Sequence, residues 1–355
     1  PVKIHSLDRG MPFPDLTKII KNLGLRNATI KQMTFASSKP RVPFSECERR
    51  TLTPDKSAGY TLREPMHHAF DTGEAWDVNN EGIALGYGCP KDQLGTRHIW
   101  TTSIDGEVEP CDLIGLPSGI NDGGTIAAQA KAGDGLEHAV RWANGKLSVL
   151  NGLEQRNSGA NSINNNDWIV GWTSTGDVKQ GQQSYRPAAW TPNELHVLHE
   201  FGCDWGEAVD VNDSGSVLVV GHQGNHCRAI LWDPLSAEWH FLSNLRGIYP
   251  KTISTDSTVL GTTRNKAGEH VVCTARLGED WKKVDLPPGF HATAMNSMGD
   301  ITGTMVLDGY GKPWLRRASG EIVWLPYYHN HWSNPRNIND ASMIVGSATT
   351  DHGSH

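Results

Sequence analysis

The residues whose types could do chemistry gather in one loop near the C-terminus. Between positions 325 and 335 the chain carries Tyr328, His329, His331 and Trp332. Histidine and tyrosine side chains can move protons near neutral pH, and an aromatic ring can stack on the face of a sugar. This loop is therefore the first candidate for a catalytic or binding site.

Other loops supply candidates of complementary chemistry. His291 and Arg246 are further candidates for catalysis, because arginine pairs with a carboxylate or a sulfate through two parallel hydrogen bonds. The candidates for ligand binding, besides Trp332, are Tyr249, Trp205, Asp204, Arg264, Tyr185 and His222. Together these residue types suit an anionic or sugar-like ligand.

Two functions remain open for this set. In the first, the loops form a binding platform for a glycan, a peptide or a protein partner. In the second, a histidine and a tyrosine flank a uronic acid, one abstracting the C5 proton and the other protonating the leaving oxygen, while an arginine neutralises the carboxylate. That chemistry would make the protein a polysaccharide lyase, but no spacing in the chain fixes the geometry that the reaction needs.

Several other classes of function lack a signal in the sequence. Lysine and arginine number 32 against 39 aspartates and glutamates, and the net charge of −7 argues against a nucleic-acid partner. No apolar stretch approaches the roughly 18 residues of a membrane span. The phosphate-binding, nucleophile-elbow and His-Glu-x-x-His motifs are absent. We therefore predict no cofactor, no metal site and no membrane-spanning segment.

A repeated motif must position the candidate loops. Seven segments read as a short strand, a turn rich in Asn, Asp and Gly, and a second apolar strand, as in residues 161–171 and 336–346. The motif asparagines, with one serine in their place, are Asn79, Asn121, Asn164, Asn212, Ser254, Asn296 and Asn339. They recur at steps of 42 to 48 residues. One propeller blade of four short strands has about that length.

A second predicted hairpin completes each repeat except the seventh, after which the chain runs out. Residues 47–54 and 65–70 resemble the missing strands. We predict an all-β fold in residues 46–355, a seven-bladed β-propeller of four-stranded antiparallel blades whose last blade is closed by N-terminal strands. Residues 1–45 form an extension with a short helix that begins near Asp15 and ends at Gly24.

The repeats resemble those of the bacterial HAF family, whose units pair a His-Ala-Phe/Val-x-Trp strand with an Ala-x-x-Ile-Asn-x-x-Gly-x-Ile-Val-Gly segment. Residues 138–142, followed by 161–171, carry the resemblance, and so do residues 337–346. It extends over nearly the whole chain after residue 46. The resemblance implies a β-propeller and, in many members, a location outside the cytoplasm, but no chemistry. The fifth repeat departs from the pattern at Ser254.

Residues that recur at equivalent positions of several repeats are expected to serve the architecture. His98, His138 and His270 start equivalent strands and should hydrogen-bond a neighbouring loop, and the motif asparagines should shape turns. In a propeller the loops between blades share a face with the loops that join the two hairpins of a blade. We therefore expect Tyr328, His329, His331 and Arg246 on one face, around the channel mouth.

Overall fold

The part of the chain that the structure describes folds into antiparallel sheets. The computed structural model describes residues 60–61, 70 and 72–354, apart from positions 91, 94, 104–106, 180–181, 199–201, 225, 235, 243–246, 308, 328–330 and 351–352. These residues belong to one compact unit, Leu52–His355. They include no helix with the length and apolar character that a bilayer crossing requires.

Six of the sheets have four strands each, and we number them blades 1 to 6 in chain order. Blades 1 to 3 contain β1 (Thr72–Val78), β2 (Ile83–Cys89), β3 (His98–Ser103), β4 (Glu109–Ile114), β5 (Leu116–Ile120), β6 (Ile126–Lys131), β7 (Glu137–Ala143), β8 (Lys146–Leu150), β9 (Ser158–Ile163), β10 (Ile169–Lys179), β11 (Gln182–Trp190) and β12 (Leu195–Val197). Blades 4 to 6 contain β13 (Trp205–Val211), β14 (Val217–Gln223), β15 (His226–Asp233), β16 (Glu238–Phe241), β17 (Tyr249–Ile253), β18 (Val259–Arg264), β19 (His270–Ala275), β20 (Lys282–Lys283), β21 (Phe290–Met295), β22 (Ile301–Leu307), β23 (Tyr310–Arg316) and β24 (Ile322–Trp324). A short 3-10 helix, η2 (Leu153–Gln155), precedes β9.

The seventh sheet is smaller than the repeats predict. It contains β25 (Ser333–Ile338), β26 (Ile344–Thr350) and β27 (Gly353–Ser354), so the structure shows six four-stranded blades and not seven. The difference arises because β26 is followed only by the two residues of β27 in the described part of the chain. The N-terminal strands predicted to complete this sheet, and the helix predicted between Asp15 and Gly24, lie outside the described residues.

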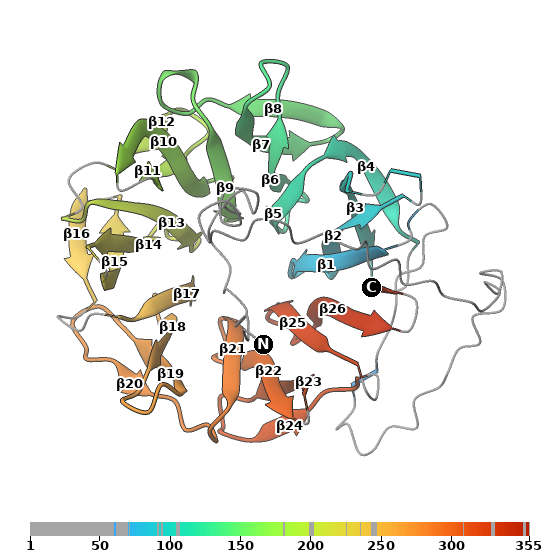
Figure 1. Cartoon of the computed structure of the whole chain (residues 1–355), viewed down its shortest axis with the longest axis vertical. Coiled ribbons are helices and arrows are strands. Elements are labelled where there is room, and N and C mark those ends of the chain that lie inside the picture. The colour runs from blue at the N-terminus through green and yellow to red at the C-terminus, as the bar shows by residue number, and fades with distance from the viewer. Residues whose placement is uncertain are drawn as a thin grey trace, which may run out of the picture. The chain divides into compact units, whose positions relative to one another are not determined.

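The seven sheets lie around a common centre, with β1, β5, β9, β13, β17, β21 and β25 innermost (Figure 1). Side-chain contacts join the seventh sheet to blade 1. Asn339 Nδ2 donates to the carbonyl oxygen of Asn79 at 2.8 Å, and Arg336 forms an ion pair with Glu74. The described sheets therefore form a closed ring, which leaves no inner strand without a neighbour on either side.

A β-bulge interrupts every inner strand three residues before the motif position. A bulge adds one residue to a strand and redirects its side chain. Three bulge residues reach the next sheet: Ser118 Oγ donates to the carbonyl oxygen of Ala160 at 2.7 Å, Asn161 Nδ2 to that of Ala208 at 2.8 Å, and Arg336 pairs with Glu74. The bulges thus supply polar links between neighbouring sheets.

The motif asparagines shape their turns as expected and also join the blades. Within its own turn each accepts a backbone N–H at Oδ1, as Asn164 does from Trp168 at 2.9 Å. Each donates from Nδ2 to the backbone carbonyl at the motif position of the next sheet. We call these six residues the asparagine ring: Asn79, Asn121, Asn164, Asn212, Asn296 and Asn339. Ser254 makes no such bond to Asn296 within the described residues, so the ring is interrupted at blade 5.

In blades 1 and 6 a glycine of the second strand packs against a tryptophan of the third strand. A Cβ atom on Gly86 would lie 2.2 Å from the Trp100 ring, and one on Gly303 would lie 2.7 Å from the Trp314 ring. Both tryptophans are buried. Apolar side chains such as Leu85 fill the remaining space between adjacent blades. This packing explains the glycine at this position in blades 1 and 6, whereas blades 2 and 4 have Ala128 and Val219 there.

Candidate functional site

The predicted site residues that the structure describes lie on the face where the inner strands begin. Because the strands of a blade alternate in direction, this face also carries the loops between the second and third strands. The turns of the asparagine ring lie on the opposite face. We call the first of these the loop face.

Three of the five predicted catalytic residues, Tyr328, His329 and Arg246, lie outside the described residues. The other two, His331 and His291, are described. His291 begins β21 and lies against His270, with ring centroids 4.2 Å apart. The grouping of all five into one catalytic centre therefore stays a prediction.

Three of the predicted binding residues form a cluster between blades 4 and 5. Trp205 of β13 and His222 of β14 are partners across the strands, and their rings stack at 3.7 Å with an interplanar angle of 5°. Tyr249 of β17 meets His222 edge-on, with centroids 6.0 Å apart. Tyr249 is 51% exposed. We call these three residues the aromatic cluster.

Electrostatics keep the centre of this cluster uncharged. Burial lowers the pKa of His222 to about 4, so its imidazole is neutral at physiological pH. A neutral ring stacks on Trp205 without the cost of placing a cation in a half-buried position. The cluster therefore presents aromatic surface and ring hydrogen-bonding groups, and no fixed charge of its own.

Three hydrogen bonds hold the loop before β13, and in one of them the Asp204 amide donates to the carbonyl oxygen of His222 at 2.8 Å. Arg186 Nη1 donates to the carbonyl oxygen of Asp204 at 2.7 Å, and the Gly224 amide donates to Asp204 Oδ2 at 3.0 Å. These bonds join blade 3 to blade 4 and tie β13 to the β14–β15 hairpin. Asp204, predicted as a ligand-binding residue, thus positions Trp205 in the described structure.

The remaining predicted binding residues lie outside the aromatic cluster. Tyr185 packs on Trp172, with centroids 4.6 Å apart. Arg264 Nη1 donates to Gly268 of its own hairpin. Trp332 lies just before β25 and is 40% exposed. These residues share the loop face with the aromatic cluster.

The repeated histidines differ in their surroundings. His138 bonds Asp134 at 2.9 Å within its own hairpin. Nε2 of His98 has no hydrogen-bond partner in the described chain, and its ring lies 6.2 Å from that of Phe70. The expected bond to a neighbouring loop is therefore absent at His98, where ring packing replaces it.

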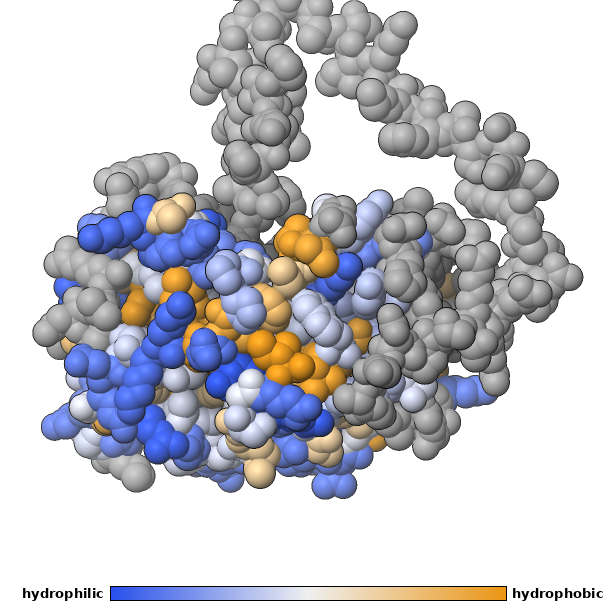
Figure 2. Space-filling view, turned by 90° about the horizontal axis from the view of Figure 1, so that it is seen from below, coloured by the Kyte–Doolittle hydropathy of each residue, from blue (hydrophilic) through white to orange (hydrophobic). Residues whose placement is uncertain are grey.

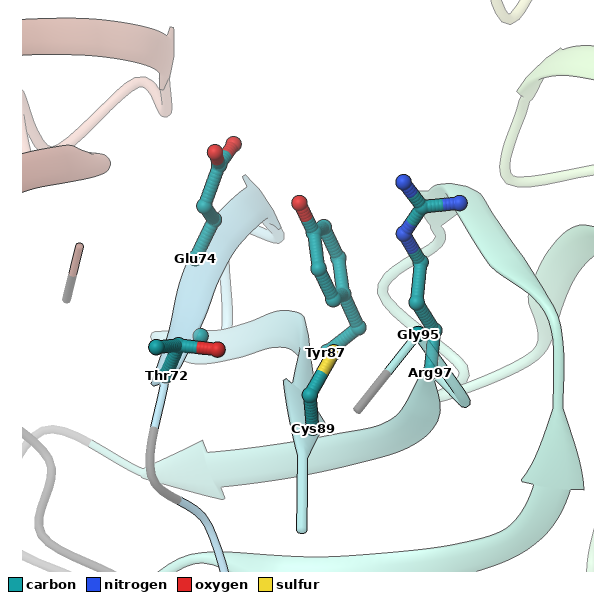
Figure 3. Close-up of a pocket in the computed structure, with 7 residues that line it drawn as sticks. Thr72, Glu74, Tyr87, Cys89, Gly95 and Arg97 are labelled. Atoms are coloured by element: carbon teal, nitrogen blue, oxygen red, sulfur yellow. The ribbon is translucent and has the colours of Figure 1, made fainter. Parts of the chain in front are cut away.

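A second cluster, which the sequence did not reveal, surrounds a cavity in blade 1. The cavity has a volume of about 140 Å³ and is lined by residues 72–74 of β1, Tyr87 and Cys89 of β2, and Gly95 and Arg97 of the following loop. In Figure 3 the polar ends of Glu74, Tyr87 and Arg97 lie side by side and point the same way. We call this space the blade 1 cavity.

Buried carboxylates of the inner strands form another group that the sequence reasoning missed. Burial raises the pKa of Asp77 to about 6, and it also raises the pKa values of Glu207 and Asp210. Asp77 accepts backbone amides from Val78 and from Ile120 of the next blade, both at 2.8 Å. These bonds assign Asp77 a role in joining blades.

Comparisons with known proteins show the fold alone. No protein-family profile matches the sequence. No curated protein matches it either. Among solved structures, acylaminoacyl peptidase from Pyrococcus horikoshii has a TM-score of 0.57 at 14% identity, over 80% of this chain and 50% of the peptidase. The β-propeller domain of the Trilobed protease from Pyrococcus furiosus has a TM-score of 0.56 at 12% identity, over 73% of this chain and 82% of that domain.

A third similar structure is puromycin hydrolase, with a TM-score of 0.52 at 10% identity, over 84% of this chain and 56% of the hydrolase. The chain thus spans about half the length of the acylaminoacyl peptidase that it resembles. Sequence identities this low support a shared β-propeller architecture and carry no information on activity.

Proposed function

We propose that this β-propeller is a binding module that holds a sugar-containing ligand against the aromatic cluster. The observation that carries the proposal is the arrangement of Trp205, His222 and Tyr249, brought together from three strands of two blades. Trp205 and His222 hold each other in a fixed stack, so little side-chain freedom is lost when a ligand binds. The half-exposed Tyr249 offers its ring to the apolar face of a sugar.

The lyase alternative finds no support in the described residues. A lyase needs a general base within hydrogen-bond reach of the substrate proton and an acid near the leaving oxygen. His291 is engaged with His270. His222, which has the lowered pKa, stacks face to face on Trp205. The geometry supports binding through aromatic surface.

A glycan array with matched variants tests the proposal. Tyr249→Ala removes the exposed ring, and Tyr310→Ala is the control, because Tyr310 is a 39% exposed tyrosine that also begins a strand on the loop face. An aromatic contact contributes about 0.5–1.5 kcal/mol beyond area burial, so we expect affinity to fall about three- to tenfold in Tyr249→Ala only. Binding by no glycan on the array, or equal effects of both substitutions, would refute the proposal.

A second candidate function, binding of a protein partner, is favoured by an exposed apolar hairpin. Val306, Leu307 and Tyr310, at the junction of β22 and β23, are 47%, 38% and 39% exposed. Figure 2 shows hydrophobic residues gathered in the middle of one side of the unit, between hydrophilic ones. Exposed apolar surface of this kind is typical of protein contacts.

We also propose membership of the HAF-repeat family and completion of the seventh sheet by the N-terminal segment. Tyr60 supports the second proposal, because it packs against a cluster that contains Leu315 of blade 6 and Ile338 of β25. The Arg317 guanidinium lies 5.6 Å from the centroid of the Tyr60 ring. These contacts bring the chain before β1 to the sheet that lacks a strand.

A further inference from the structure

We infer that the blade 1 cavity is a binding site for a small organic monocarboxylate. This site is separate from the aromatic cluster, so the inference goes beyond the proposed function and its test is independent of glycan binding. The argument rests on the shape of the cavity, on its charge and on the hydrogen-bond donors in its wall.

The backbone creates the space. Glu74 and Tyr87 are partners across β1 and β2. A Cβ atom on Gly73 would lie 2.6 Å from the Tyr87 carbonyl oxygen, so the close approach of the two strands requires a glycine there. Gly95 has a φ of +97°, a conformation that favours glycine. No side chain therefore projects from the loop at this position. The volume of about 140 Å³ suits a ligand of a few heavy atoms.

The negative charge in the wall is already paired. Glu74 forms an ion pair with Arg336 of β25, and their side chains are 19% and 9% exposed. The Arg336 guanidinium lies 4.6 Å from the centroid of the Trp76 ring, which holds it in place. The Arg336 guanidinium therefore neutralises Glu74, and no cationic ligand is needed for this.

Arg97 supplies the positive charge for an incoming anion. No carboxylate among the described residues forms an ion pair with it, and its guanidinium lies 5.3 Å from the centroid of the Tyr87 ring. The guanidinium carries five N–H groups in a fixed fork, which match the two oxygens of a carboxylate.

Tyr87 adds a hydrogen-bond donor, because its phenol stays protonated at neutral pH. Burial and the negative charge of Glu74 raise the pKa of Tyr87 above its usual value, although Arg97 opposes them. The phenol therefore keeps its proton at neutral pH and can donate a hydrogen bond to a bound acceptor. One guanidinium and one phenol O–H match the two oxygens of a single carboxylate.

The charge balance selects a monoanion. A carboxylate neutralises Arg97, which has no carboxylate partner among the described residues, whereas a phosphate dianion would bring a second negative charge beside Glu74. The small volume and the aromatic wall of Tyr87 accommodate a short apolar tail. The inferred ligand is thus a carboxylate on a short carbon chain.

Calorimetric titration of the full chain with propionate tests the inference, with propionamide as the uncharged isostere and inorganic phosphate as the dianion. We expect saturable propionate binding with a Kd on the order of 1 mM. Propionamide and phosphate should bind at least about tenfold more weakly, since a hydrogen bond to a charged group is worth that much or more.

Two variants locate the site, and a third is the control. Arg97→Gln should weaken propionate binding at least about tenfold, and Tyr87→Phe, which keeps the ring, about threefold or more. Arg276→Gln, whose guanidinium bonds Thr258 and Asp256 of blade 5, should leave binding unchanged. Circular dichroism and thermal unfolding verify that each variant is folded. Absence of propionate binding, equal binding of propionamide, tighter binding of phosphate, or no effect of Arg97→Gln would overturn the inference.

Discussion

Substitution of one member of the asparagine ring tests how the blades are held together. Asn164 is 4% exposed and makes three side-chain hydrogen bonds. Its Nδ2 donates to the carbonyl oxygen of Asn212 at 2.8 Å, and its Oδ1 accepts the amides of Trp168 at 2.9 Å and Asn166 at 3.0 Å. Asn164→Ala removes all three bonds at the junction of blades 3 and 4.

The expected loss follows from the groups left without a partner. The carbonyl of Asn212 and the amide of Trp168 lose their partners at a junction where Asn164 itself excludes water. Each such group costs about 1–3 kcal/mol, so together they should lower the free energy of unfolding by about 2–6 kcal/mol. The Asn166 amide lies in a turn where water can replace the lost hydrogen bond, so its loss adds nothing to the expected decrease in the free energy of unfolding.

Urea denaturation monitored by tryptophan fluorescence measures this difference. Asn193→Ala is the matched control, because Asn193 is an exposed turn residue whose side chain forms no hydrogen bond within the described residues. Its effect should stay below about 0.5 kcal/mol. If Asn164→Ala lost less than about 1 kcal/mol with an unchanged dependence on urea, the ring would not contribute as we describe.

Two further predictions concern the same junctions. Ser254→Asn should complete the ring by donating to Asn296 and should stabilise the protein by about 0.5–1.5 kcal/mol in the same assay, and a decrease would show that blade 5 cannot accommodate the amide. The raised pKa of Asp77, about 6 against 3.8, means that the folded state holds this proton more tightly, so its contribution to stability is full below pH 3.8 and is lost as the pH rises through about 6. The stability of the wild type relative to Asp77→Asn should therefore fall by up to about 3 kcal/mol between pH 4 and pH 7, and a flat difference would contradict the assignment.

Local turn chemistry explains how much of the fold could be predicted. The motif at 161–171 predicts a strand, a turn and a strand, and the structure has β9, a turn and β10 there. The turn requires positive φ three residues after the asparagine, which Gly82 supplies at +79°. Asp167 adopts +60° at the equivalent position, where its side chain bonds Asn121 at 2.8 Å. Such signals lie within a few residues, so a sequence displays them.

The aromatic cluster could be predicted only in part. Trp205, His222 and Tyr249 are recognisable as candidates by their residue types and by their positions at strand ends. Their mutual contact depends on the register of β13 and β14 and on the neighbouring position of blade 5. Composition reveals neither the strand register nor the neighbouring blade. The sequence therefore predicted that these residues share a face but did not predict their mutual contacts.

The sequence alone determined the repeat, its inner hairpins and the propeller architecture, because each depends on residues close together in the chain. Only the tertiary structure decided the blade 1 cavity. Glu74 and Arg336 are 262 positions apart and meet only because the ring closes, with Arg336 turned toward blade 1 by a bulge that no local motif announces. Ring closure and bulges act over the whole chain, and for that reason they are visible in three dimensions and not in the order of the residues.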